Sequence, residues 1–484
     1  MVGITGYGAY VPRLRLQRAA AAKANAWLAP NLMGKAKGER AMANWDEDAI
    51  TMAVEAVRDA LGPADDRAYV KTLLFATTTA PFSDRLNAGI VSAALTLERS
   101  AGAADVTGSQ KAGVTALSTA LATASGLPPG GHALVCAADK RRARAASAQE
   151  LDFGDAGAAF LIGGEDVLAD WIGGAVTTAD FVDHFRGEGE EFDYSWEERW
   201  IRDEGFAKLV PPTIERALKS AKVAGGDVTH FILPSVFKGV PESIAKKLGV
   251  KPEAVRDSMS ATIGEAGCAH ALLMFAHALE TAKEGDVFVV AQFGQGCEAN
   301  VFRATKKVET WKPQRGVSGW LANRKEETNY MKFLVFNDLV EWDRGMRAEK
   351  DNKTALTTLY RANDQILGLV GGRCRETGTV QFPRTRISVN PNAPTVDTQE
   401  PYKFAERAAS VLTWSADYLT YAMSPPNHYG MITFEGGGRI FMDITDVEPG
   451  DVDSGVGVRM AFRVKEKDER RGFTRYFWKA VPVR

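Results

Sequence analysis

The segment ADVTGSQKAG, residues 104–113, is typical of a turn on which an enzyme mounts a nucleophile, because it lies between a hydrophobic run and a helix-like stretch. The start of a helix offers free amide groups and positive potential, which stabilise a thiolate or an oxyanion. At the expected position stands Gln110, whose amide cannot attack a carbonyl carbon. Its neighbour Ser109 is either an acylated nucleophile or a structural turn residue, and no base stands near it in the sequence.

Three further side chains could move a proton or bond to an acyl group. Glu265, in TIGEAGCAHALL, is either a general base that faces a pocket or a carboxylate that stabilises the start of the following helix. Cys268, in the same segment, is either a displaced nucleophile or a small buried side chain. His184 is flanked by Asp183 and Arg186, so it is either a proton shuttle or one partner of a surface ion pair.

The composition favours a soluble, cytoplasmic protein that binds neither nucleic acid nor membranes. The 59 Lys and Arg residues nearly cancel the 61 Asp and Glu residues, so no overall field attracts a polyanion. The four cysteines form no CxxC pair, which argues against a disulfide framework and against a thiol-rich metal site. The start MVGITGYGAYVP does not read as an export signal, and no apolar run approaches about 18 residues.

Short strand-like runs alternate with helical patterns over residues 1–165. This alternation predicts an α/β fold with a mostly parallel sheet. Residues 166–305 repeat a similar order, and both stretches close on a Gly-rich return, FGDAGAAFLIG in the first and FGQGCEANVF in the second. We therefore expect two duplicated halves, 1–165 and 166–305.

Three other segments interrupt or follow these halves. Residues 178–206 are dense in charges and aromatic residues, which favours a solvated or interface insertion over a direct part of a site. Residues 306–330 are expected to be a linker. Residues 331–484 contain short, regularly spaced strand-like runs with Gly-rich turns, which predict a small β-barrel or sandwich.

Residues 1–305 resemble the thiolase superfamily, particularly the 3-hydroxy-3-methylglutaryl-CoA synthases and the ketoacyl synthases. The segments DVTGSQKAGVTAL, FGDAGAA, IGEAGCAHALL and FGQGCEANVF carry the resemblance through their order and spacing. It implies the five-layered thiolase fold built from two duplicated halves, with an acyl-CoA thioester as substrate. It also implies a homodimer, or a complex with another thiolase-like subunit.

The resemblance implies a catalytic set, and this sequence departs from it at every position. The family's cysteine nucleophile is replaced by Gln110, its histidine by Pro234, its asparagine or histidine before the last long helix by Glu265, and its acid after the third strand by Thr78. Coenzyme A carries phosphates, which need cations at the mouth of its binding site. The candidate cations are Lys238, Arg199, Arg202 and Lys208.

Residues 331–484 resemble the acyl-CoA-associated OB-fold family, through LYRANDQILGLVGGRCRETGTVQFP. The resemblance implies a zinc finger ahead of the barrel, with two CxxC pairs as tetrahedral ligands. Only Cys374 remains here, Thr377 stands at its partner's place, and the second pair should fall within RISVN, residues 386–390. We therefore predict a degenerate finger that binds no zinc.

Three functions are compatible with these residues. The first is an enzyme that makes or breaks a C–C bond beside a thioester without an acyl-cysteine, by retro-aldol or retro-Claisen cleavage or by decarboxylation, with Gln110 donating to an enolate oxygen. The second is an acyltransferase of the 3-hydroxy-3-methylglutaryl-CoA synthase or thiolase type with a replaced nucleophile. The third is a non-catalytic, acyl-CoA-binding scaffold for an active thiolase. The sequence alone favours the first.

Overall fold

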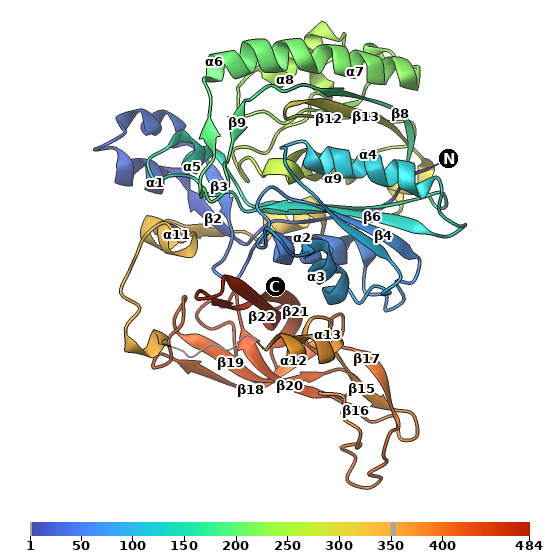
Figure 1. Cartoon of the computed structure of the whole chain (residues 1–484), viewed down its shortest axis with the longest axis vertical. Helices are drawn as coiled ribbons and strands as arrows, with labels where there is room; N and C mark the ends of the chain where they lie inside the picture. Colours follow the sequence, from blue (N-terminus) through green and yellow to red (C-terminus); the bar gives the residue numbers. More distant parts are fainter. Residues whose placement is uncertain (1, 350–354) are drawn as a thin grey trace.

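The computed structural model describes residues 2–349 and 355–484, which form a large α/β domain followed by a smaller β domain (Figure 1). Within these residues, nine strands form one sheet in the order β11-β12-β13-β8-β1-β7-β6-β4-β5. The α/β class predicted from the sequence is confirmed. The expectation of a mostly parallel sheet is wrong, because β7 and β13 each run antiparallel to the strand that precedes them in the chain.

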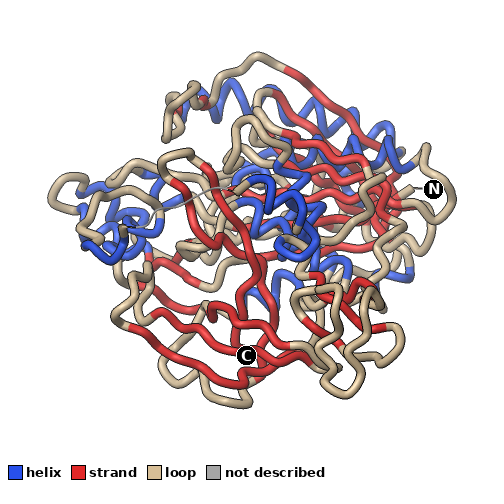
Figure 2. The backbone as a smooth tube through the Cα atoms, turned by 60° about the horizontal axis from the view of Figure 1, so that its bottom comes forward, coloured by secondary structure: helices blue, strands red, loops and turns tan. Residues whose placement is uncertain are grey.

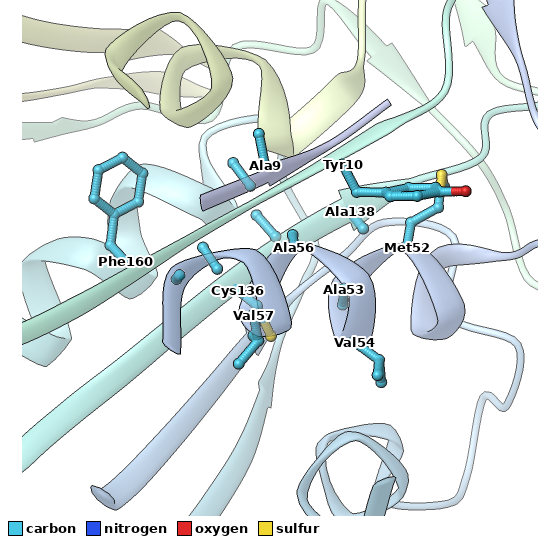
Figure 3. Packing of buried hydrophobic residues seen from close by; sticks show 14 of the residues in the cluster. Ala9, Tyr10, Met52, Ala53, Val54, Ala56, Val57, Cys136, Ala138 and Phe160 are labelled. Atoms are coloured by element: carbon cyan, nitrogen blue, oxygen red, sulfur yellow. The ribbon is translucent and has the colours of Figure 1, made fainter. Parts of the chain in front are cut away.

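The first half of this sheet carries helices on both faces. Its strands are β1 (Gly3–Tyr10), β4 (Val70–Ala76), β5 (Gly102–Val106), β6 (His132–Asp139) and β7 (Ala156–Gly163). On the outer face lie α2 (Ala49–Leu61) and α3 (Asn87–Ala94), and on the inner face lies α4 (Ala112–Ala124). Small side chains such as Ala53 and Ala56 let α2 lie close to the strands (Figure 3). The approach is so close that a Cβ on Gly8 would lie 2.4 Å from the backbone nitrogen of Ala60.

The second half repeats this arrangement. Its strands are β8 (Ala169–Thr178), β11 (His230–Ile232), β12 (Val287–Phe293) and β13 (Gly296–Ala304). Outside them lie α7 (Ala207–Ala221) and α8 (Val240–Lys247), and inside lies α9 (His270–Leu279). Figure 1 shows the resulting succession of layers, with α4 and α9 between the strands of the two halves. The segments that precede these two central helices therefore meet in the middle of the domain.

Residues 306–330, expected as a linker, pack onto the large domain. The ring centroid of Trp311 lies 4.8 Å from that of Tyr7, and the ring centroid of Trp320 lies 4.6 Å from that of Tyr10. The flanking elements are β2 (Leu14–Gln17), α1 (Arg18–Asn25), β3 (Glu39–Met42), α5 (Ala148–Asp152), α10 (Gly316–Ala322), β14 (Lys325–Glu327) and α11 (Tyr330–Phe336). Because β14 pairs with β2, this segment is part of the domain's structure.

The C-terminal region contains a closed barrel with the strand order β18-β19-β20-β22-β21 (Figure 2). Its strands are β18 (Ala409–Asp417), β19 (Asn427–Phe434), β20 (Arg439–Ile444), β21 (Gly457–Asp468) and β22 (Phe473–Pro482). Before it come α12 (Leu356–Arg361), α13 (Asn363–Ile366) and a sheet of β15 (Val370–Cys374), β16 (Val380–Gln381) and β17 (Gln399–Lys403). The predicted small β-barrel is confirmed.

The residues around Cys374 form a hydrogen-bonded cluster. The Cys374 Sγ lies 3.2 Å from the hydroxyl of Thr395 and 3.2 Å from that of Thr398, and these two hydroxyls lie 2.8 Å apart. The expectation that the second ligand pair falls within residues 386–390 is therefore wrong, because it is the TxxT at 395–398 that faces the thiol. Thiolates and imidazoles, and not threonine hydroxyls, are the usual protein ligands of structural zinc.

Buried ion pairs fix the barrel to the large domain. Arg463 of β21 is fully buried and lies 2.9 Å from Glu47 and 3.0 Å from Asp446. Lys479 of β22 lies 2.9 Å from Asp46. These two cations face three carboxylates, so the group is neutral when one carboxyl keeps its proton. Burial raises the pKa of Glu47 to about 7, against the opposing effect of Arg463.

The urea midpoint of the protein is expected to fall as the pH rises from about 4.5 to about 7, and to fall less in the variant Glu47→Gln. In this pH range the native Glu47 binds a proton that the unfolded chain has released, so each pH unit removes roughly 1 kcal/mol of stability. Urea titrations at several pH values measure the slope, and the exposed Glu253→Gln provides the control. Equal slopes for the wild type and Glu47→Gln would contradict this assignment.

Candidate active site

The turn that carries Gln110 lies between β5 and α4, where it meets the turn between β12 and β13 of the other half. The hydroxyl of Ser109 donates to the carbonyl oxygen of Gly294 at 2.7 Å. A Cβ on Gly294 would lie 2.7 Å from the Ser109 oxygen and 2.8 Å from the backbone nitrogen of Lys111, so glycine permits this approach. Ser109 thus holds the two turns together, and the Gln110 side chain is mostly buried beside them.

The insertion at residues 178–206 brings His184 to this turn. β9 (His184–Phe185) pairs with β10 (Tyr194–Ser195), and the chain then enters α6 (Glu198–Trp200) and a π-helical stretch, Ile201–Phe206. The Nε2 of His184 lies 3.2 Å from the side-chain amide of Gln110, and its Nδ1 lies 2.8 Å from the Asp183 carboxylate. A carboxylate that orients an imidazole in this way is the usual support of a general acid or base.

Arg141, two residues after the end of β6, completes the surroundings of Gln110. Its guanidinium donates to Asp193 at 2.8 Å, bonds Glu265, and lies 3.7 Å from the ring centroid of Phe153. Burial lowers the pKa of Arg141, but Glu265 and Asp193 outweigh burial and raise the pKa above its ordinary value. Glu265 is therefore the partner of a buried cation.

The orientation of the Gln110 amide follows from these neighbours. With its oxygen toward Arg141, it accepts from the two terminal guanidinium nitrogens at 3.0 and 3.1 Å, and from Nε2 of His184 at 3.2 Å. In this orientation Nε2 of His184 is the donor to the Gln110 oxygen, and Nδ1 faces the Asp183 carboxylate. The amide NH2 of Gln110 is then turned away from Arg141 and His184.

A chain of charged groups continues from Arg141 to the loop after β4. Asp193 also lies 2.9 Å from Arg186, which in turn donates to the carbonyl oxygen of Thr78. Burial would raise the pKa of Asp193, but the guanidinium of Arg141, and then that of Arg186, hold it below its ordinary value. The insertion is thus bound to the loop after β4 by a hydrogen bond and to the end of β6 by an ion pair.

The buried carboxylate of Asp139 fixes the loops around the site. It accepts from the backbone nitrogen of Thr78 at 2.7 Å and from the Thr78 hydroxyl at 3.0 Å. It also accepts from the hydroxyl of Thr77 at 2.9 Å and from the backbone nitrogen of Cys268 at 2.8 Å. The side chain of Thr78 therefore positions the loop after β4 through Asp139.

Cys268 lies in the core beside this carboxylate. Its Sγ is fully buried and lies 3.4 Å from the carbonyl oxygen of Ala76. Burial, and then the charge of Asp139, raise the pKa of the Cys268 thiol well above its ordinary value. A thiol in these surroundings stays protonated and is a poor nucleophile.

Iodoacetamide at about pH 8 is expected to modify Cys268 no faster than Cys297, a buried thiol whose pKa burial raises to about 12. Only the thiolate reacts, and neither side chain forms one readily in the folded protein. Peptide mass spectrometry after timed alkylation measures both rates, with the urea-unfolded chain as the fully reactive control. Selective labelling of Cys268 in the folded protein would restore it as a candidate nucleophile.

The remaining predicted residues lie apart from this cluster. The four cations suggested for coenzyme A are exposed to solvent, and three of them bond acids of their own helical stretch. They are Arg199 and Arg202, which share Asp203, then Lys208, which bonds Glu204, and finally Lys238, in the loop after β11. Pro234 is buried in the same loop. No contact among the described residues joins these cations to Gln110 or His184.

Sequence reasoning missed Arg141, Asp193 and Asp139. A signal was present for two of them, because DKRR at residues 139–142 follows the buried strand run HALVCAA directly. Charges at the end of a buried strand are a sign of a site at the edge of a sheet. Asp193 carried no such signal, since it is one of several acids in the insertion.

Comparisons with known proteins match the large domain. The family described as "3-Oxoacyl-[acyl-carrier-protein (ACP)] synthase III C terminal" matches residues 218–303, within the second half of the sheet. The hydroxymethylglutaryl-CoA synthase of Methanopyrus kandleri is 28% identical over 319 residues, 64% of this chain and 89% of the relative. That of Aeropyrum pernix is 28% identical over 335 residues, 68% of this chain and 92% of the relative.

Solved structures show the same fold. An HMG-CoA synthase complexed with CoA aligns with a TM-score of 0.58 at 18% identity, over 73% of this chain and 95% of that chain. The 3-oxoacyl-(acyl carrier protein) synthase III FabH of Pseudomonas aeruginosa PAO1 aligns with a TM-score of 0.53 at 19% identity, over 63% and 98% respectively. Among the described residues, no helix has the length and apolar character needed to cross a membrane. Together the matches show that the large domain is similar in sequence to hydroxymethylglutaryl-CoA synthases and shares the fold of these synthases and of the 3-oxoacyl-(acyl carrier protein) synthase III.

Proposed function

We propose that this protein is an acyltransferase that moves an acyl group directly from a CoA thioester to a carbon nucleophile, without an acyl-cysteine intermediate. The similarity to hydroxymethylglutaryl-CoA synthases supports an acyl-CoA acyltransferase, the second of the three functions considered, over cleavage and over a non-catalytic scaffold. One observation supports the direct transfer without an acyl-cysteine. An Asp183–His184 pair faces Gln110 at the turn where a nucleophile would stand.

In this proposal His184 carries the proton through the reaction. In its neutral form it takes a proton from the carbon of the acceptor, and the resulting carbanion attacks the thioester carbonyl. The C–S bond then breaks, and the imidazolium returns the proton to the leaving sulfur. The products are the acylated acceptor and free CoA, so atoms and charge balance. Asp183 stabilises the imidazolium between the two steps.

Gln110 acts on the oxygen of the reacting carbonyl. Its amide oxygen is held by Arg141 and its NH2 points away from that cation, so the NH2 is fixed before the substrate arrives. A fixed donor stabilises the negative charge that develops on the oxygen in the transition state. Arg141 itself is occupied by Asp193 and Glu265, so its role is to position Gln110.

Purified protein incubated with acetyl-, malonyl- and β-hydroxyacyl-CoA thioesters, followed by mass spectrometry of both products and intact protein, tests the proposal. We expect free CoA, a product with a new C–C bond, and no acylated protein at any time. An acyl adduct on the protein would overturn the direct transfer. Shortened acyl-CoA products alone would favour cleavage, and no turnover together with a co-purified, Cys-bearing thiolase would favour the scaffold.

We also infer that the protein forms a homodimer through β5. This strand lies at the end of the nine-stranded sheet and leaves one edge without a neighbouring strand of the described chain. Such edges are available to pair with a second copy, and two-fold dimers are the commonest assemblies. A complex with another thiolase-like subunit through the same edge is the alternative, and the mass of the purified particle distinguishes the two.

A further inference from the structure

A large cavity lies between the large domain and the barrel. Its volume is about 1220 Å³, which is ample for a small organic ligand. The large domain contributes residues near 45–49, 78–81 and 140–142, and the barrel contributes residues near 420–423 and 464–474. The cavity therefore exists only because both domains are present in one chain.

Part of the cavity wall is apolar. It includes Trp45, Pro81, Phe336, Tyr421 and Met423, contributed by both domains and by α11. Aromatic and thioether side chains favour flat or flexible apolar molecules and discriminate little between them. The wall thus suits the body of an aromatic compound or of an acyl chain.

The lining of the cavity includes the ammonium group of Lys140, which has a free hydrogen-bond donor for a ligand. The Nζ of Lys140 donates to the carbonyl oxygens of Glu47 at 3.2 Å and Phe336 at 3.3 Å, which leaves its third N–H. Among residues 2–349 and 355–484, no carboxylate lies within 4 Å of this Nζ. By contrast, three other cations of the cavity bond carboxylates. These are Arg142 with Glu191, Arg344 with Glu469, and Lys465 with Asp443.

Lys140 also connects the cavity to the candidate active site. In the sequence DKRR, Asp139 and Arg141 contact the groups around Gln110, whereas Lys140 and Arg142 line the cavity. Arg186 lines the cavity too, and it bonds Asp193 of the same charged chain. A molecule bound in the cavity would therefore lie beside the groups that hold Gln110 and His184.

We propose that this cavity binds a carboxylate with an apolar, aromatic or acyl body. Lys140 binds the carboxylate, because a half-buried ammonium with one spare N–H can form a charge-assisted hydrogen bond to a charged oxygen. The apolar wall binds the body. This binding site does not rest on the proposed function and does not require turnover.

The fluorescent sulfonate 1-anilinonaphthalene-8-sulfonate has an anionic group on an aromatic body and serves as the probe. We expect saturable binding to the wild type, and a dissociation constant raised roughly tenfold or more in Lys140→Met. The uncharged N-phenyl-1-naphthylamine should bind both proteins within about threefold, because it uses the wall alone. Ala422→Trp, which fills the cavity from the barrel side, should weaken both probes.

Matched variants separate the site from general effects on the fold. Lys71→Met removes a half-buried lysine that also donates to a backbone carbonyl, that of Ala68, but lies outside the cavity, so it should leave both probes unchanged. Lys140→Arg should keep binding of the sulfonate within about threefold, since it keeps the charge. Unchanged binding of the sulfonate in either Lys140→Met or Ala422→Trp would overturn the proposal.

The variant His184→Ala distinguishes this inference from the proposed function. It should bind the sulfonate as the wild type does even though turnover is lost, because His184 does not line the cavity. Aromatic and acyl carboxylates should displace the sulfonate from both proteins. If they fail to displace it, the proposed class of ligand is wrong, whatever the outcome of the turnover experiment.

Discussion

Replacing His184 with alanine is expected to lower kcat for acyl transfer by about 10²–10⁴-fold, with little change in KM for the thioester. In the proposed reaction the imidazole both removes the proton of the acceptor and protonates the leaving sulfur. Alanine removes the group that does both, while the contacts of Arg141 with Asp193 and Glu265 remain. The rate of CoA release with the acceptor at saturation measures the loss.

Two variants make this result specific to the Asp183–His184 pair. Asp183→Asn should also lower kcat, because an amide no longer stabilises the imidazolium, and this loss should vary with pH. His132→Ala removes a histidine that contacts Tyr69. His132 begins β6, at the opposite end of this strand from Asp139 and the site, so turnover should stay within about twofold. Full turnover in His184→Ala would show that the pair is an ordinary ion pair at the edge of the insertion.

The sequence located the turn that carries Gln110 but not the groups that surround it. The turn is a local feature, since a short strand, small residues and a helix follow one another within about twenty residues. The contact between Gln110 and His184 joins positions 74 apart. It depends on the path of the insertion, whose composition alone favours a surface segment.

Two other differences between the sequence-based predictions and the structure have the same physical origin. Thr395 and Thr398 meet Cys374 because the loop between β16 and β17 folds back, and a loop's path is not set by residue periodicity. Likewise, the segment expected as a linker is rich in charge, yet Trp311 and Trp320 anchor it on Tyr7 and Tyr10. Periodic elements were predicted well because their pattern is local, whereas the site is assembled from the segments between them.

Replacing Gln110 with glutamate is expected to lower kcat by about 10²–10³-fold while leaving the fold intact. One carboxylate oxygen can still accept from Arg141, as the amide oxygen does, so the packing around the turn is kept. The other oxygen replaces the NH2 that donates to the reacting carbonyl, and its negative charge opposes the charge that develops there. The effect should therefore appear in kcat, with an unchanged thermal midpoint as the check on folding.

Gln110→Ala separates loss of the donor from the added charge. It also removes the NH2 but brings no negative charge to the reacting oxygen, so it should retain more activity than Gln110→Glu. If the two variants rank in the opposite order, the amide oxygen's bonds to Arg141 and His184 matter more than the donor, because only alanine loses those bonds. If both keep wild-type turnover, Gln110 has no part in the transition state, and the acyl group must be activated by another side chain of the site.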